Sequence, residues 1–150
     1  MHSFIAWLYH HHGFNTQGKL YGLGISSNSN CYICDQEEET SQHLFFKCQY
    51  SRKVIQLIRT WTGVQISADN TQNWRQHIRF TRLKVGTLNS IVNAIIYHVW
   101  LQWNGSRHEH KLISPSRCVA MIQYDIITRI QQQARGTMSM KDRLWLEKLM

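Results

Sequence analysis

Three cysteines and one histidine lie close together in this sequence, at spacings typical of metal ligands. Two residues separate Cys31 from Cys34, eight separate Cys34 from His43, and four separate His43 from Cys48. A C-x2-C turn places two thiolates near one tetrahedral centre, and a short return brings an imidazole and a third thiolate to it. Four nitrogen and sulfur ligands leave no open position for a reactive water. The pattern therefore predicts one structural zinc ion held by Cys31, Cys34, His43 and Cys48.

Two other readings of these residues remain open from the spacing alone. The three cysteines could be buried free thiols next to an unrelated surface histidine. A disulfide would leave one of the three unpaired and requires an oxidising compartment. Clustered Cys and His at ligand spacing favour metal over both. The fourth cysteine, Cys118, is predicted to pack as a small hydrophobic residue beside Val119 and Ile122.

The segments between the predicted ligands have contrasting character. Residues 35–39, Asp-Gln-Glu-Glu-Glu, are predicted to form a solvated acidic loop, because hard carboxylates compete poorly with thiolates for zinc. Such a loop could still raise the local metal concentration or repel nucleic acid. Leu44, Phe45 and Phe46 are predicted to be core residues that tie the zinc loop to the helices. A base-stacking role for Phe45 is the alternative.

No catalytic residues are predicted. A polymerase needs adjacent aspartates to hold magnesium, and the chain has no Asp-Asp pair. An RNase H site needs several carboxylates on a sheet, whereas the nine acidic residues here include four in one loop and follow no strand pattern. Two-metal chemistry is therefore unsupported. His98 lies within a strong helical pattern and is predicted to be a helix-surface or hydrogen-bonded core residue, since no Cys or His lies four positions away.

The chain is strongly basic, with a formal charge of +8 and a pI near 9.6. Such an excess favours a polyanionic partner, nucleic acid first. One basic segment has helical spacing and interleaved aromatic residues, and its cations are the predicted phosphate contacts: Arg75, Arg79, Arg82 and Lys84. An ordinary solvated helix face is the alternative. A second cluster, residues 107–111, is predicted mainly to compensate a helix dipole.

The fold is predicted to be mainly α, with helices packed around a small zinc-stabilised loop and no sizeable sheet. Apolar residues recur at helical spacing, most clearly over 87–103. Caps and stop signals predict helices at 4–12, 16–23, 50–61, from 70 or 71, 87–103, 115–135 and 140–150. The chain divides into a zinc-binding part, residues 1–63, and a helical part, residues 70–150, which could form one compact unit.

Nothing in the sequence predicts a membrane or secretory protein. There is no apolar run of transmembrane length. The first residues lack the basic region and the cleavage site of a signal peptide. The expected location is intracellular, in the nucleus or cytoplasm, where cysteine clusters indicate metal more often than disulfides.

A resemblance becomes visible along residues 2–62. The segments HSFIAWLYHHHGFNTQGKLYGLGI and CYICDQEEETSQHLFFKCQYS resemble the zinc-binding domain that follows the reverse transcriptase in plant non-LTR retrotransposon polyproteins. The likeness is specific over 31–51. Residues 95–109 are similar, more loosely, to a segment further downstream in those polyproteins, and Leu101, Trp103 and Gly105 depart from it.

The resemblance implies the same four zinc ligands, matched residue by residue, and an ancestor that worked on RNA and DNA beside a reverse transcriptase. The family's domain usually begins upstream, so the chain is expected to be N-terminally clipped. Either a decayed element or a fragment in host use would have this form. The predicted function is a non-catalytic, retrotransposon-derived zinc module that binds nucleic acid weakly. The alternative is a protein-interaction module.

Overall fold

The described residues fold into helices, with no β-strand among them. A computed structural model describes residues 2–67, 81–133 and 138–150. Within these ranges the only strand-like pairing is an isolated bridge between Asn30 and Glu38. The elements are α1 (His2–His10), α2 (Gln17–Gly22), the π-helix η1 (His43–Lys47), α3 (Gln49–Thr62), α4 (Arg82–Glu109), α5 (Pro115–Gln133) and α6 (Met140–Leu149). The prediction of a mainly α fold is confirmed.

Several helix ends lie where capping residues predict them. Gly63 ends α3 in the left-handed region, with φ 69°, and its N–H donates to the Arg59 carbonyl. Ser114 precedes Pro115 and its hydroxyl accepts from the Arg117 N–H at 3.3 Å. Ser139 caps α6 by accepting from the Asp142 N–H. These local signals therefore determine where the helices begin and end.

Helix α4 is longer than the predicted 87–103 segment. The prediction followed the apolar stripe, which starts at Leu88. The helix starts earlier because Thr81 acts as its N-cap and accepts from the Lys84 N–H. It ends at Glu109, and His110 follows in the left-handed region with φ 54°. The predicted helix from residue 70 or 71 lies outside the described residues.

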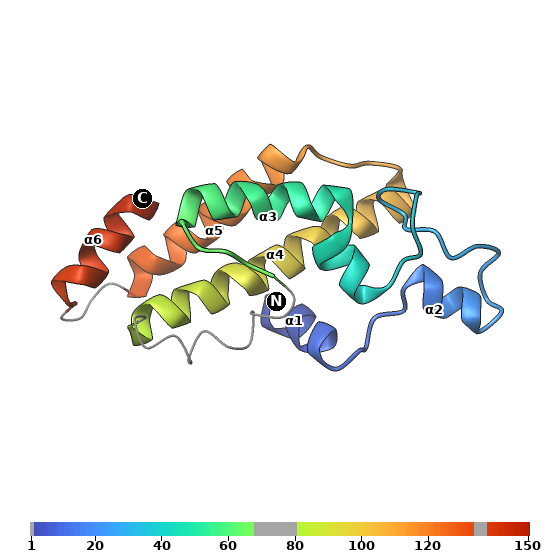
Figure 1. The fold of residues 1–150 in the computed structure, drawn as a ribbon, viewed down its shortest axis with the longest axis horizontal. Coiled ribbons are helices and arrows are strands. Elements are labelled where there is room, and N and C mark those ends of the chain that lie inside the picture. Colours follow the sequence, from blue (N-terminus) through green and yellow to red (C-terminus); the bar gives the residue numbers. More distant parts are fainter. Residues whose placement is uncertain (1, 68–80, 134–137) are drawn as a thin grey trace.

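Helix α4 is the central element of the core. Figure 1 shows it running through the long axis of the molecule, with α3 and α5 beside it and α1 against its other side. Leu88, Ile91, Ile95, Ile96 and Val99 are fully buried. The whole predicted stripe is buried, because neighbouring helices cover several sides of α4.

Helix α6 is attached to the other helices by polar contacts. The Asp142 carboxylate accepts from the Thr81 hydroxyl, which caps α4, and from the Ser139 hydroxyl at 2.7 Å, which caps α6. The Trp61 indole N–H donates to the Leu149 carbonyl at 2.9 Å. One carboxylate therefore joins the starts of two helices, while α3 holds the end of α6.

The cysteine-rich loop docks on the C-terminal part of α4. The Ser106 hydroxyl donates to the Tyr32 carbonyl at 2.8 Å. The Arg107 guanidinium lies 5.2 Å from the centre of the Trp103 ring and 5.6 Å from that of Tyr32. Arg107 therefore makes cation–π contacts that hold the loop against α4, in addition to its favourable place near the helix C-terminus.

None of the helices in the described ranges is long and apolar enough to cross a bilayer.

Candidate metal centre

The fold brings the four predicted ligands to one point. One ligand atom from each of Cys31, Cys34, His43 and Cys48 lies within 4.8 Å of the other three. The Cys34 Sγ and the His43 Nε2 are 3.4 Å apart. Tetrahedral zinc, with bonds of about 2.3 Å to sulfur and about 2.0–2.1 Å to nitrogen, separates such ligand atoms by about 3.5–3.8 Å. The four side chains therefore fit a single tetrahedral ion.

Backbone hydrogen bonds shape the turn that carries Cys31 and Cys34. The Asp35 N–H donates to the Cys31 carbonyl at 2.8 Å, and Asp35 itself has φ 53°. The Cys31 N–H donates to the Glu37 carbonyl at 2.9 Å. The chain thus folds back directly after the second cysteine. Both sulfurs then face the segment that carries the other two ligands.

The other two ligands lie at either end of a π-turn. The Cys48 N–H donates to the carbonyl of His43, five residues earlier, at 2.6 Å. In a regular α-helix, residues five apart would point about 140° away from each other. The wider turn brings them to the same side, which explains why four intervening residues suit this centre. The π-turn was not predicted from the sequence, although such turns are frequent at functional sites.

The Glu37 carboxylate lies next to the ring nitrogen of His43 that faces away from Cys34. The His43 Nε2 faces Cys34, and the His43 Nδ1 lies 3.3 Å from the Glu37 Oε2. A carboxylate in this place fixes the tautomer of a metal-binding histidine and increases its basicity. Glu37 therefore orients the imidazole while its own side chain stays 66% exposed.

Glu39 differs from the predicted solvated loop. Its side chain is fully buried. Oε1 accepts from the Gln17 N–H at 2.8 Å and Oε2 accepts from the Tyr32 N–H at 2.9 Å. The prediction is wrong for this residue because composition suggested a uniform acidic loop, whereas two backbone donors satisfy the carboxylate and make its burial tolerable. Glu39 joins the start of α2 to the C-x2-C turn.

The two fully buried cysteines of the cluster titrate together. The Cys48 sulfur accepts a hydrogen bond from the Cys31 thiol, which raises the pKa of Cys31, and burial raises it further. The same hydrogen bond lowers the pKa of Cys48. The shared proton between Cys31 and Cys48 thus reduces the electrostatic repulsion that two thiolates would have. A bound cation would take over this role, and both thiols would then be deprotonated.

Aromatic packing anchors the centre to the core. Phe45 is fully buried, and its ring centre lies 5.3 Å from that of Tyr9 and 5.1 Å from that of Phe14. Leu44 and Phe46 are buried as well. The prediction of core roles for these three residues is confirmed. Since none of the Phe45 ring is exposed, it is not available for base stacking.

Two further residues behave as predicted and lie away from the centre. Cys118 is fully buried, and burial raises the pKa of its thiol to about 11, so it stays protonated at neutral pH. His98 is buried with its Nε2 2.8 Å from the Asp125 Oδ2. It is a hydrogen-bonded core histidine.

The structure describes only part of the predicted basic segment. Arg75 and Arg79 lie outside the described residues. Arg82 is exposed at the start of α4. The Lys84 Nζ lies 5.1 Å from the centre of the Trp145 ring, and partial burial lowers the pKa of its ammonium group. Lys84 is thus engaged with α6, which makes it a weaker candidate for phosphate contact than Arg82.

Comparison with known proteins gives one match. Residues 1–54 match the model of a protein family described as zinc-binding in reverse transcriptase. The searches of curated proteins and of solved structures found no match. The matched segment contains all four clustered side chains and the start of α3. Residues 1–54 of this chain are therefore similar to the zinc-binding domains found in reverse transcriptase, and the match covers about a third of the chain.

Proposed function

We propose that the chain is a structural zinc module that catalyses no reaction and binds nucleic acid weakly. The observation that carries the zinc assignment is the convergence of four nitrogen and sulfur atoms within 4.8 Å. Cys31, Cys34, His43 and Cys48 would hold the ion. A bound zinc ion would link the C-x2-C turn to the π-turn and so stabilise the fold around both. One zinc ion per chain in native mass spectrometry is the direct test.

The donor set supports the proposal that the zinc ion has no catalytic role. Four protein ligands close a tetrahedral sphere, so no water can bind the ion and become a nucleophile. We expect the purified chain to show no magnesium-dependent primer extension, nuclease or protease turnover. Reproducible turnover that co-purifies with the chain, and that persists after a second chromatographic step, would contradict this proposal.

The nucleic-acid assignment is supported by charge. The formal charge of +8 favours polyanions. Three zinc-bound thiolates and one Zn²⁺ together would lower that charge by only one unit. Without base-edge contacts, binding should be weak, with Kd about 10⁻⁴–10⁻⁶ M at physiological salt and little sequence preference.

The Arg75→Gln/Arg79→Gln/Arg82→Gln variant tests the predicted basic segment. If these residues contact phosphates, the variant should bind all sequences more weakly, and its salt slope should fall by about one unit for each contact removed. Fluorescence titration of a labelled oligonucleotide at low and moderate salt measures both quantities. An unchanged affinity and slope would mean that this segment is only solvated surface.

A protein-interaction module is the second candidate, favoured by an exposed aromatic row on α1. Phe4 and Trp7 are 59% and 52% exposed, and their ring centres lie 6.2 Å apart with nearly parallel planes. Trp7 also stacks on His11 at 4.4 Å. Large exposed aromatic residues are enriched at protein interfaces. Salt separates the two candidates, since phosphate binding weakens steeply with salt and an apolar interface does so much less.

A further inference from the structure

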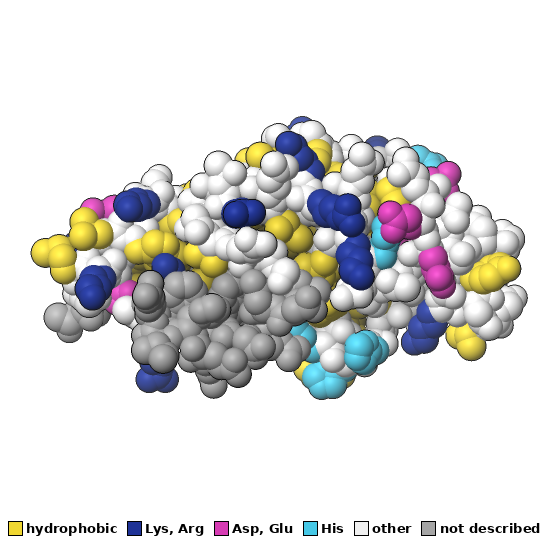
Figure 2. Space-filling model, viewed as in Figure 1, with side chains coloured by type: hydrophobic (Ala, Val, Ile, Leu, Met, Phe, Trp, Pro, Cys, Tyr) yellow, Lys and Arg dark blue, Asp and Glu magenta, His cyan; other side chains and the backbone are white. Residues whose placement is uncertain are grey.

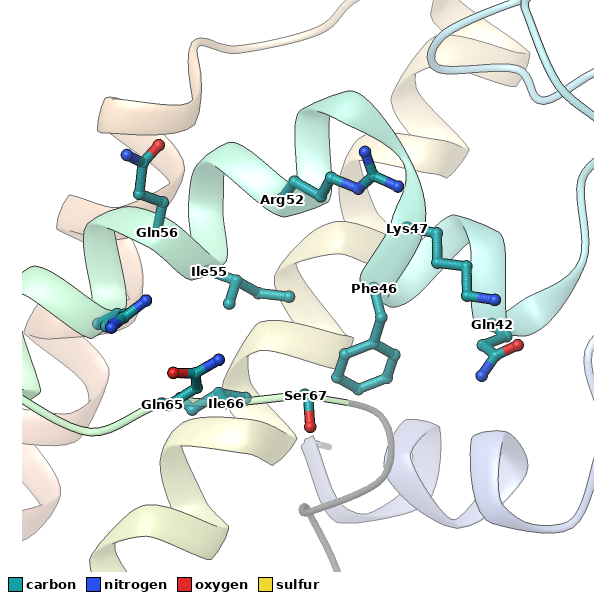
Figure 3. A pocket seen from close by; sticks show the side chains of 10 residues that line it. Gln42, Phe46, Lys47, Arg52, Ile55, Gln56, Gln65, Ile66 and Ser67 are labelled. Carbon is teal, nitrogen blue, oxygen red and sulfur yellow. The ribbon is translucent and has the colours of Figure 1, made fainter.

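The surface next to the metal centre contains a groove that was not predicted from the sequence. It lies between α3 and residues 65–67, and its lining also includes Gln42, directly before η1, and Phe46 and Lys47 within η1. We name it the α3 groove. Its volume is about 340 Å³, within the range of about 300–1,000 Å³ that holds small organic groups. Figure 3 shows the Phe46 ring pointing into the space between η1 and Ser67.

The walls of the α3 groove are basic. Arg52 and Arg59 lie seven residues apart, two turns along the same face of α3, and both side chains are exposed. Lys47, also exposed, adds a third cation at the π-turn. Among the described residues, no carboxylate pairs with any of these three cations. Figure 2 shows Lys and Arg side chains across this face of the molecule, over α3.

The floor of the groove is apolar and its rim carries amides. Phe46 and Ile66 are 7% and 5% exposed, and Ile55 is half-buried between the two arginines. Gln42, Gln56 and Gln65 line the rim, and all three side chains are exposed. Cations alone would suit any polyanion. Cations combined with an apolar floor and amide groups suit a ligand with a charged backbone and flat, partly polar side groups.

We propose that the α3 groove binds one strand of nucleic acid, with Lys47, Arg52 and Arg59 contacting phosphates and a base entering over Phe46 and Ile66. The inference rests on the proposed nucleic-acid binding and specifies its site. A single strand fits better than a duplex because only unpaired bases can leave the stack and reach an apolar floor. The basic segment around Arg82 would then contribute at most a second set of contacts.

The test compares two triple variants that remove the same charge. Lys47→Gln/Arg52→Gln/Arg59→Gln empties the groove of cations, and the matched control Lys141→Gln/Arg143→Gln/Lys148→Gln removes three exposed cations from α6. Each is titrated with labelled single-stranded oligonucleotides and with a duplex of the same length at several salt concentrations. Circular dichroism and zinc content confirm that both variants are folded.

We expect the groove variant to bind the single strand roughly tenfold more weakly at low salt, with the slope of log K against log salt reduced by about two units. The α6 control should stay within about twofold of the parent. Equal losses of affinity in both variants would contradict binding in the α3 groove. The proposed function would still stand, because such a result would reflect a general effect of charge. No binding by the parent would overturn both. If the parent binds poly-glutamate as tightly as the single strand, and the groove variant loses both, the α3 groove would be a site for acidic protein segments and the proposal would be wrong.

Discussion

Cys48→Ser is expected to abolish zinc binding and to unfold the region around residues 25–60. A hydroxyl is a poor substitute for a thiolate, and the three remaining ligands cannot close the sphere. Structural zinc contributes about 10–16 kcal/mol of apparent binding free energy in small finger peptides at neutral pH. The effect should be large here because the Cys48 side chain is fully buried and directly precedes α3, so loss of the ion would release the start of that helix.

The matched control for Cys48→Ser is Cys118→Ser. Cys118 is a buried cysteine on α5 that belongs to no cluster of metal-binding side chains among the described residues. Its replacement should lower the free energy of unfolding modestly and leave one zinc per chain. Native mass spectrometry measures the zinc content, and amide hydrogen exchange locates the loss of structure. Equal zinc loss in both variants would show that the ligand set is wrong.

Glu39→Ala is expected to produce the second largest effect. It would leave the buried N–H group of Gln17 without its present acceptor, at a cost of about 1–3 kcal/mol, and would remove the acceptor of the part-buried Tyr32 N–H at a smaller cost. The start of α2 and the C-x2-C turn would lose their shared contact. Urea unfolding of the zinc-loaded protein should therefore show a lower midpoint, and hydrogen exchange should rise at both N–H groups.

Two further variants separate hydrogen bonding from charge at this position. Glu39→Gln retains one carbonyl oxygen as an acceptor but places an NH₂ group against the other donor, so it should recover only part of the loss. Glu38→Ala removes the same charge from an exposed side chain of the same loop and should change stability little. A Glu38→Ala effect as large as that of Glu39→Ala would indicate a role of loop charge in place of the buried hydrogen bonds.

Local features of the sequence predicted most of the helices and the composition of the metal cluster. Gly63, Pro115 and Ser139 mark helix ends because the conformation or hydrogen bond that each supplies depends only on neighbouring residues. The apolar stripe of α4 predicted its buried face. The start of α4 could not be inferred from that stripe, since its N-cap, Thr81, precedes the first buried residue of the helix.

The sequence by itself determined which side chains could hold zinc, because ligand chemistry and short spacing are local properties. Only the tertiary structure decided how those side chains meet and what supports them. The π-turn depends on where η1 packs, and the burial of Glu39 depends on N–H groups that lie 22 and 7 residues away along the chain. The α3 groove likewise combines a helix face with the separate segment 65–67. Such features require long-range contacts, which composition and periodicity do not encode.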